Sequence, residues 1–309
     1  MHSLCVKVPK KDAEKTRRYL AKLGVLADMK IKKYGEYVLI PVKERIDGFE
    51  LCEDDFEEKK RGKKIGSFDI VGDIAILKYK EGVDYISLAE GLIREHKNIK
   101  KVAVDYGVSG FERIRNLRLI IGEGFETIHK EFGIRLKVDI SRVYFSPRLA
   151  TERWRILEKV KDGEIIFDMF SGCGPFSILI AKYRRVKIFA CDINPHAIYY
   201  LIENIKMNKV KGIIPLLGDA RAMATSIRAD RIIMNLPHSS FNFLDSALKA
   251  ANKGAYIHYY EILPRENEKE IEIVELAENL GYKIEILEKR RVHPYSPSKD
   301  MFSFLIHLI

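Results

Sequence analysis

DMFSGCGPFS, residues Asp168–Ser177, is the stretch that decides the fold of this 309-residue chain. It closes an apolar strand and opens a helix, so Gly172 and Gly174 fall in the connecting turn. Glycine permits positive φ there and lets the backbone approach a ligand closely. By itself a GxG turn is a weak indication of a ligand site, because a purely structural turn uses the same residues.

The sequence after Pro147 alternates long helices with short apolar strands, which is typical of a parallel sheet buried on both faces. We expect its strands at Glu164–Phe170, Lys187–Asp192, Gly212–Asp219, Asp230–Leu236 and Gly254–Tyr260. An acidic helix, Glu266–Leu280, a strand in KIEILEKRRV and a final apolar run, FSFLIHLI, follow. The pattern predicts an α/β fold with a mainly parallel, Rossmann-like sheet.

Two smaller α+β domains are expected before this sheet. Residues 1–62 read as strand LCVKV, a helix over Asp12–Leu23 and strands at Met29–Ile31 and Tyr37–Val42. The charged segment Glu53–Lys64 is interpreted as a linker, with a charged surface helix as the alternative. Residues 66–145 contain FDIVGDIAILKY, a helix over Tyr85–His96, strand KVAVDY and a hairpin around Phe132-Gly133. Residues 146–309 form the third domain.

Charge and cysteine usage limit the class of protein. The 54 basic and 44 acidic residues give a net charge of +10, which favours a polyanionic partner. Most of the excess lies in residues 1–150, which carry 31 of the basic and 24 of the acidic residues. The four cysteines form no CxxC pair, which excludes a zinc ribbon and disfavours a disulfide-stapled secreted scaffold. With neither a signal peptide nor about 18 consecutive apolar residues, we expect a cytoplasmic protein without a membrane span.

Acidic residues at later strand ends strengthen the interpretation of the glycine turn as a cofactor site. Asp192 lies at the end of the next strand, where a carboxylate can accept hydrogen bonds from two ribose hydroxyls. The third glycine of a GxGxxG motif is missing, so the turn suits a nucleoside cofactor without a pyrophosphate, such as S-adenosylmethionine. Asp219 could accept the adenine amine or could simply cap a helix.

The most specific motif is Asn235-Leu236-Pro237-His238, at the end of the fourth strand. An asparagine followed by a rigid proline presents an amide oxygen and a backbone carbonyl in fixed geometry to the N–H groups of a planar base. A turn with an N-cap asparagine is the alternative. That alternative loses weight because GxGPFS, DINP and GDA precede the motif at successive strand ends.

The ordered blocks VYFSPRLATER, DMFSGCGPFSI, DINPHAI, LGDA, MNLPHSSFNFLD, HYY and VHPYSP resemble the archaeal and eukaryotic tRNA (guanine37-N1)-methyltransferases of the Trm-five type. The resemblance covers essentially the whole chain. It implies a class I methyltransferase domain, S-adenosylmethionine as cofactor and tRNA, both anticodon loop and body, as partner. It also implies a tRNA-binding role for the first module and a contribution of the middle domain to RNA binding and to the active site.

The same resemblance implies roles for individual residues. Glu152 becomes the general base that removes the N1 proton, although a first-turn glutamate favoured by the helix dipole is the alternative. Arg113 becomes the arginine that stabilises charge on O6, with neighbouring Arg115 as the alternative. Asn235 would orient the base. The expected cofactor residues are Arg153, Asp168, Phe170, Gly172, Gly174, Asp192, Ile193, Asp219, Ala220, Asn235 and Pro237, and Tyr144, Arg148 and Arg115 are expected at the substrate.

Other functions are compatible with parts of this sequence. A relative from the wybutosine pathway would methylate the tricyclic base derived from G37, in addition to or instead of N1, or would transfer an aminocarboxypropyl group. A noncatalytic RNA-binding protein would keep the fold and the basic surface, and an NAD oxidoreductase is disfavoured by the missing glycine. We expect no metal, and we expect a monomer.

Overall fold

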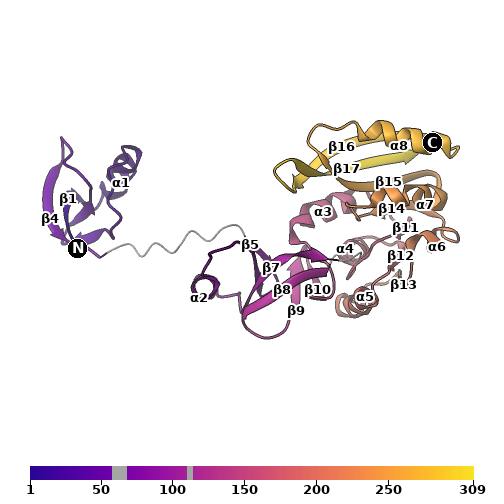
Figure 1. Ribbon diagram of the computed structural model, residues 1–309, viewed down its shortest axis with the longest axis horizontal. Helices are drawn as coiled ribbons and strands as arrows, with labels where there is room; N and C mark the ends of the chain where they lie inside the picture. Colours follow the sequence, from indigo (N-terminus) through magenta and orange to yellow (C-terminus); the bar gives the residue numbers. More distant parts are fainter. Residues whose placement is uncertain (58–67, 110–113) are drawn as a thin grey trace. The chain divides into compact units, whose positions relative to one another are not determined.

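Asp168–Ser177 connects strand β11 (Ile165–Asp168) to helix α4 (Pro175–Tyr183), as the sequence predicts (Figure 1). The computed structural model describes residues 1–57, 68–109 and 114–309. The chain divides into two compact units, Met1–Ile65 and Gly66–Ile309. The finer division of the second unit near residue 145 stays a prediction.

The central sheet of the second unit has seven strands in the order β13-β12-β11-β14-β15-β17-β16. In that order the strands are Ile213–Leu217, Lys187–Asp192, Ile165–Asp168, Ala229–Met234, Ala251–Pro264, Lys299–Leu308 and Ile284–Pro294. The first five run parallel, and β17 pairs antiparallel with both β15 and β16. The five predicted parallel strands are therefore confirmed, and their carboxyl ends meet at one edge.

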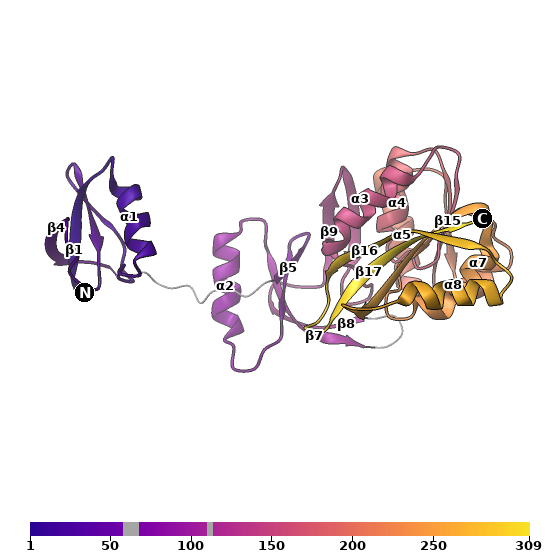
Figure 2. The same cartoon turned by 90° about the horizontal axis from the view of Figure 1, so that it is seen from above.

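Helices cover both faces of this sheet (Figure 2). One face packs against α3 (Ala150–Lys159), α4 and α5 (Pro195–Asn208), and the other against α6 (Ala220–Ala224), α7 (Leu244–Ala250) and α8 (Lys269–Asn279). Consecutive strand residues point to opposite faces, so Ile166 lies in the first core and Phe167 in the second. Burial on both sides explains why the inner strands β11 and β14 are mostly apolar without regular alternation.

A smaller sheet and a hairpin precede the central sheet. The sheet has the order β5-β6-β7-β8, with strands Phe68–Val71, Ile74–Lys78, Lys101–Ser109 and Ile114–Ile121, and helix α2 covers Tyr85–Glu95. The predicted hairpin is formed by β9 (Glu126–Glu131) and β10 (Ile134–Asp139). The Asn204 and Asn208 side chains of α5 accept hydrogen bonds from the backbone of β10 at 2.7 and 2.8 Å. This hairpin therefore shares a core with the central sheet.

The first unit is an antiparallel sheet in the order β2-β3-β1-β4 with one helix, α1 (Ala13–Lys22). Its strands are Lys32–Tyr34, Tyr37–Pro41, His2–Pro9 and Glu50–Asp55. The expected linker Glu53–Lys64 is wrong at its start, because Glu53–Asp55 belongs to β4. β4 is an edge strand, so its backbone pairs with β1 while its charged side chains stay in solvent. Residues 58–64 lie outside the described part.

The cysteines fall into two classes. Cys5 and Cys52 face each other across β1 and β4, with Cα atoms 5.0 Å apart, and are joined by a disulfide. Their wide separation in sequence gave no signal of this pairing. Cys173 and Cys191 are buried thiols, and burial raises the pKa of each to about 12, so neither is suited to nucleophilic chemistry.

Candidate functional site

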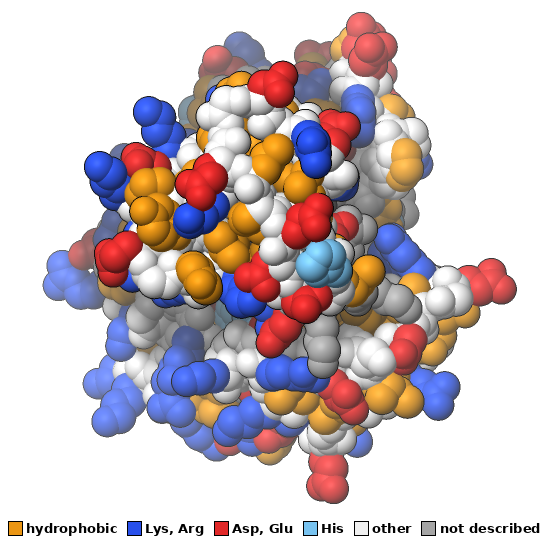
Figure 3. Space-filling model, turned by 90° about the vertical axis from the view of Figure 1, so that its left-hand side faces the viewer, with side chains coloured by type: hydrophobic (Ala, Val, Ile, Leu, Met, Phe, Trp, Pro, Cys, Tyr) orange, Lys and Arg blue, Asp and Glu red, His pale blue; other side chains and the backbone are white. Residues whose placement is uncertain are grey.

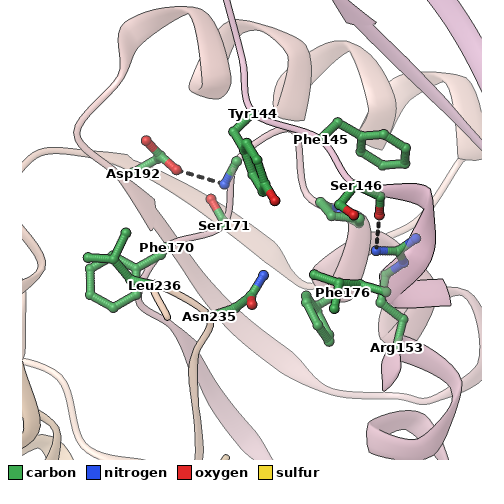
Figure 4. Close-up of a pocket in the computed structure, with 13 residues that line it drawn as sticks. Tyr144, Phe145, Ser146, Arg153, Phe170, Ser171, Phe176, Asp192, Asn235 and Leu236 are labelled. Atoms are coloured by element: carbon green, nitrogen blue, oxygen red, sulfur yellow. Dashed lines mark hydrogen bonds between the residues drawn. The ribbon is translucent and has the colours of Figure 1, made fainter. Parts of the chain in front are cut away.

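A pocket of about 100 Å³ lies at the carboxyl ends of β11, β12 and β14, beside the start of α3 (Figure 4). It is lined by Tyr144, Phe145, Ser146, Leu149, Arg153, Phe170, Ser171, Gly172, Pro175, Phe176, Asp192, Asn235 and Leu236. Ligand pockets commonly enclose about 300–1,000 Å³, so this cavity can enclose only part of a nucleoside cofactor. The remainder would lie over the neighbouring strand ends, where Ile193 is 59% exposed.

The glycine turn forms one wall, and Asp192 fixes its shape. One Asp192 oxygen accepts a hydrogen bond from the Gly172 amide at 2.7 Å, and the other accepts one from the Asn194 amide at 2.9 Å. Gly172 and Gly174 both have positive φ, 54° and 86°. The carboxylate expected at the ribose is therefore held in the pocket wall by the turn itself.

Asn235 provides the most unusual polar atom of the pocket. Its Oδ1 is buried and has no hydrogen-bond partner within the described residues. Such an atom is costly unless a ligand satisfies it. The rings of Phe170 and Phe176 and the side chain of Leu236 surround it, while Tyr144 reaches into the pocket from the loop before α3 (Figure 4). The Ser171 hydroxyl, which also lines the pocket, is likewise buried without a partner among the described residues. Apolar rings beside unsatisfied acceptors suit a flat ligand that carries N–H groups.

Arg153 brings a positive charge to the pocket from α3. The residue is 1% exposed, and its guanidinium forms two hydrogen bonds with Glu131 of β9, at 2.5 and 2.6 Å. Burial works against the charged form of Glu131, but hydrogen bonds from His129 and Arg153 outweigh it and lower its pKa. The Arg153 side chain is thereby fixed over the Phe145 ring, 5.4 Å from its centroid.

Glu152, the neighbouring residue on α3, is 2% exposed and is not among the residues that line the pocket. Its carboxylate accepts hydrogen bonds from Arg155 at 3.0 and 3.2 Å and from the Tyr260 hydroxyl at 3.2 Å, and it pairs with Arg290. Glu152, the expected base, therefore precedes the pocket residue Arg153 in sequence, and its carboxylate lies within a cluster of cations. The Tyr260 ring also contacts pocket residue Phe176, with centroids 6.4 Å apart.

Comparison with known proteins identifies the family. A model of the TRM5/TYW2 methyltransferase domain matches residues 127–286, more than half of the chain, and a model of the tRNA methyltransferase 5 N-terminal domain matches residues 5–50. The chain belongs to the TRM5/TYW2 methyltransferase family.

Two curated relatives and one solved structure illustrate the similarity to this family. The chain is 44% identical to the tRNA (guanine(37)-N(1))-methyltransferase Trm5b of Pyrococcus abyssi, across 96% of both chains. It is 33% identical to a tRNA(Phe) (4-demethylwyosine(37)-C(7)) aminocarboxypropyltransferase of Methanocaldococcus jannaschii, across 74% of this chain and 92% of that one. The solved complex of aTrm5 and tRNALeu is 38% identical, with a TM-score of 0.72 over 99% of this chain and all of the other.

Six residues that the TRM5/TYW2 resemblance implied at the site line the pocket together. They are Tyr144, Arg153, Phe170, Gly172, Asp192 and Asn235. They come from four separate segments, so their convergence depends on the order of strands in the central sheet.

Other expected residues lie near the pocket without lining it. Asp168 is fully buried beneath the turn and accepts a hydrogen bond from Ser177 at 2.7 Å. Asp219 caps α6 through the Arg221 amide at 2.8 Å, which is the alternative that the sequence left open, and Ala220 begins that helix. Four further residues outside the lining set are Gly174, Ile193, Pro237 and Glu152.

The two expected substrate arginines in the described part share one carboxylate. Asp69 pairs with Arg148 at 2.7 Å and with Arg115 at 3.8 Å. Arg115 also pairs with Asp105 at 2.9 Å, and its guanidinium lies 5.9 Å from the centroid of the Tyr144 ring. Arg113, the arginine expected at O6, lies outside the described residues.

Seven lining residues are absent from the sequence prediction: Phe145, Ser146, Leu149, Ser171, Pro175, Phe176 and Leu236. Five of them adjoin a predicted residue in sequence, so including the neighbours of each TRM5/TYW2 motif residue would have found those. The two that adjoin no predicted residue are Ser146, directly before Pro147, and Phe176 of α4. Phe176 is an apolar helix position, where pattern alone cannot distinguish a pocket wall from core. Glu131 gave no signal, because it lies on the hairpin 22 residues before Arg153.

Proposed function

We propose that this protein transfers a methyl group from S-adenosyl-L-methionine to N1 of guanosine 37 of tRNA. The observation that carries the proposal is the 44% identity to Trm5b of Pyrococcus abyssi along nearly the full length of both chains. The pocket agrees chemically, since it combines an unsatisfied amide oxygen, apolar walls and a carboxylate at a strand end. When bound, the cofactor supplies an electrophilic methyl group on a sulfonium centre.

The protein's own residues would bind both partners of this reaction and move the proton. Asp192 and the turn of Gly172 would hold the cofactor, and the Asn235 oxygen would accept an N–H group of the guanine. Guanine N1 carries a proton at neutral pH, so a base must remove it, and Glu152 is our candidate. Arg113 would stabilise the negative charge that develops on O6. The target guanine must leave the stack of the anticodon loop to enter the pocket. Tyr144, which reaches into the pocket, would pack against this base.

Transfer RNA is the polyanion that fits the net charge of +10. Basic side chains gather along part of the face shown in Figure 3, with acidic ones scattered among them. We assign the tRNA body to the first unit and the anticodon loop to the second. No helix in the described residues combines the length and the apolar character that a membrane crossing requires. A monomeric, cytoplasmic enzyme is part of the proposal.

A second candidate function comes from the aminocarboxypropyltransferase, which is 33% identical over 74% of this chain. That reaction would move a different group of the same cofactor. A further alternative is methylation of the tricyclic wyosine intermediate in addition to N1. The NLPH motif and Glu152 favour methyl transfer to N1, because both serve a planar base whose ring nitrogen must lose a proton.

The test uses S-adenosylmethionine labelled either in its methyl group or in its carboxyl group. Each is supplied with matched transcripts that carry G37 or A37. We expect label on the G37 transcript alone, and only when the label is in the methyl group. Transfer of a carboxyl label would support the aminocarboxypropyl reaction. Label on both transcripts would contradict the choice of base. RNA binding without any transfer would identify a noncatalytic protein.

A further inference from the structure

The Glu152 carboxylate is buried among charged side chains from α3, β15 and β16. Arg155 approaches from the next turn of α3, Tyr260 from β15 and Arg290 from β16. Only 3% of the Glu152 side chain is exposed, compared with 17% of Arg155 and 36% of Arg290. Burial disfavours the charged form of a carboxylate, and nearby cations favour it.

The two oxygens of Glu152 are bonded unequally. Oε2 accepts from Arg155 Nη2 at 3.0 Å, from Arg155 Nε at 3.2 Å and from the Tyr260 hydroxyl at 3.2 Å. Oε1 contacts Arg290 Nη2. An ionised carboxylate oxygen has about two acceptor positions, so Oε2 is saturated. Oε1 is the oxygen that can still receive a proton.

A second carboxylate holds the two arginines in place. Glu288 of β16 pairs with Arg155 at 2.7 Å and with Lys159 at 3.2 Å, and it lies 3.7 Å from Arg290 Nε. Ser303 of β17 accepts a further hydrogen bond from Arg155 at 3.2 Å.

Two more titratable groups near this cluster lie on neighbouring strands. His258 of β15 is buried, and burial, together with the charges of Arg231 and Arg155, lowers its pKa well below the usual value. It therefore adds no charge at neutral pH. Arg231 of β14 pairs with Glu164 at 2.7 Å. The net positive charge around Glu152 thus comes from Arg155, Arg290 and Lys159, offset by Glu288.

We propose that Arg155 and Arg290 are positioning residues for methyl transfer: they keep Glu152 ionised and oriented so that Oε1 accepts the proton of the guanine. The proposal rests on the proposed function, in which Glu152 is the base. Arg155 fixes Oε2 and so sets the direction of Oε1. Arg290, the more exposed cation, contacts Oε1 and stabilises its charge until the base arrives.

The test measures single-turnover methyl transfer to the G37 transcript as a function of pH, in the full-length protein. In Arg290→Gln the carboxylate loses one cation, so the acid limb of the profile should move up by about one pH unit. Below the limb the rate should therefore fall about tenfold. Cofactor affinity should stay unchanged, and Arg290→Lys should restore most of the shift. In Arg155→Lys the limb should stay, because the charge remains, while the maximal rate falls.

Lys289→Gln is the matched control. Lys289 is the neighbouring residue of β16, but it pairs with Glu270 of α8 at 2.7 Å, away from Glu152. Its loss should leave the profile in place, and melting curves of all variants confirm that they are folded. An equal loss of rate at every pH in Arg290→Gln, or an unmoved limb, overturns the proposal.

Combining Arg290→Gln with Glu152→Gln distinguishes the role of Glu152 as base from the positioning role of the arginines. If Glu152 is the base, its substitution removes the acid limb, and adding Arg290→Gln changes nothing further. A limb that persists in Glu152→Gln would refute the base and the positioning residues together. A limb that disappears in Glu152→Gln but does not move in Arg290→Gln would refute only the positioning role.

Discussion

Asp168 carries a carboxyl group that the fold buries completely beneath the glycine turn. Burial, reinforced by the nearby charge of Asp192, raises its pKa to about 7, despite the hydrogen bond from Ser177. The unfolded chain releases this proton near pH 4, whereas the folded protein holds it to about pH 7. The stabilising contribution of the bound proton is present below about pH 4 and is lost as pH rises to about 7. The loss amounts to about 4 kcal/mol.

We therefore expect Asp168→Asn to gain stability relative to wild type as pH increases. The two proteins should melt at similar temperatures near pH 4, and the variant should melt higher at pH 8, because its amide cannot ionise. Thermal melting without cofactor, at a series of pH values, measures the difference. Asp219→Asn is the control, because hydrogen bonding to Arg221 lowers the pKa of Asp219 and its amide variant should show no such gain. A difference that is constant with pH would contradict the prediction.

Site residues that belong to a local sequence motif could be predicted. Residues that act through partners far away in sequence could not. Asp192 and Asn235 stand at strand ends, where α/β topology brings them together, and both line the pocket. Glu131 and Arg290 reach their partners from a hairpin and from a late strand. Nothing local in the sequence specifies these pairings, because they depend on how separate elements pack.

At the scale of elements, the turn between β11 and α4 contains two glycines with different constraints. A Cβ on Gly174 would lie 2.4 Å from Leu201 Cδ1, a buried atom of α5, and 3.2 Å from Ile178 Cγ1. A Cβ on Gly172 would meet nothing closer than the Tyr144 carbonyl oxygen at 3.7 Å. Gly172 is therefore required by its backbone angle, and Gly174 also by the packing of α4 on α5.

Gly172→Ala and Gly174→Ala should consequently differ in their cost. Left-handed backbone costs alanine about 1 kcal/mol, which applies to both. The overlap with Leu201 should add about 2 kcal/mol for Gly174→Ala alone. Urea denaturation of the two variants measures the free energy of unfolding. Equal losses would show that α4 and α5 shift apart freely.

The elements themselves were predicted unevenly. Inner strands of the sheet, such as β12, can be recognised by their apolar runs. Both predicted ends of β12, Lys187 and Asp192, are confirmed. β4 was missed because an edge strand needs only one paired side and carries charged side chains. β8 was missed as well, since FERIRNLRLII mixes charged and apolar residues on a strand that ends its sheet.

At the scale of the whole molecule, one of the two cores of the second unit crosses the predicted boundary at residue 145. Buried residues of β9–β10 and of the smaller sheet, including Ile74 and Leu136, belong to the same cluster as Ile156 and Phe176. The pair of Arg153 with Glu131 crosses the boundary too. Removal of the earlier part would expose this core and leave Arg153 buried without its partner.

Two truncated chains test this arrangement. Residues 66–309 should fold cooperatively and bind S-adenosylmethionine as the full chain does, because the pocket lies within that unit. Residues 146–309 should fail to give a cooperative melting transition. Calorimetry and titration of the cofactor measure both properties. A stable, cofactor-binding 146–309 chain would show that the boundary predicted from sequence is an independent folding boundary.

The state of the cysteines has a practical consequence for spectroscopy. Two sulfurs are bonded to each other and the other two are shielded inside the protein, so a maleimide dye should find no reactive native thiol. A single cysteine introduced at an exposed position in each unit would then carry donor and acceptor fluorophores without background labelling. Energy transfer between them would follow the distance between the units in solution as tRNA is added.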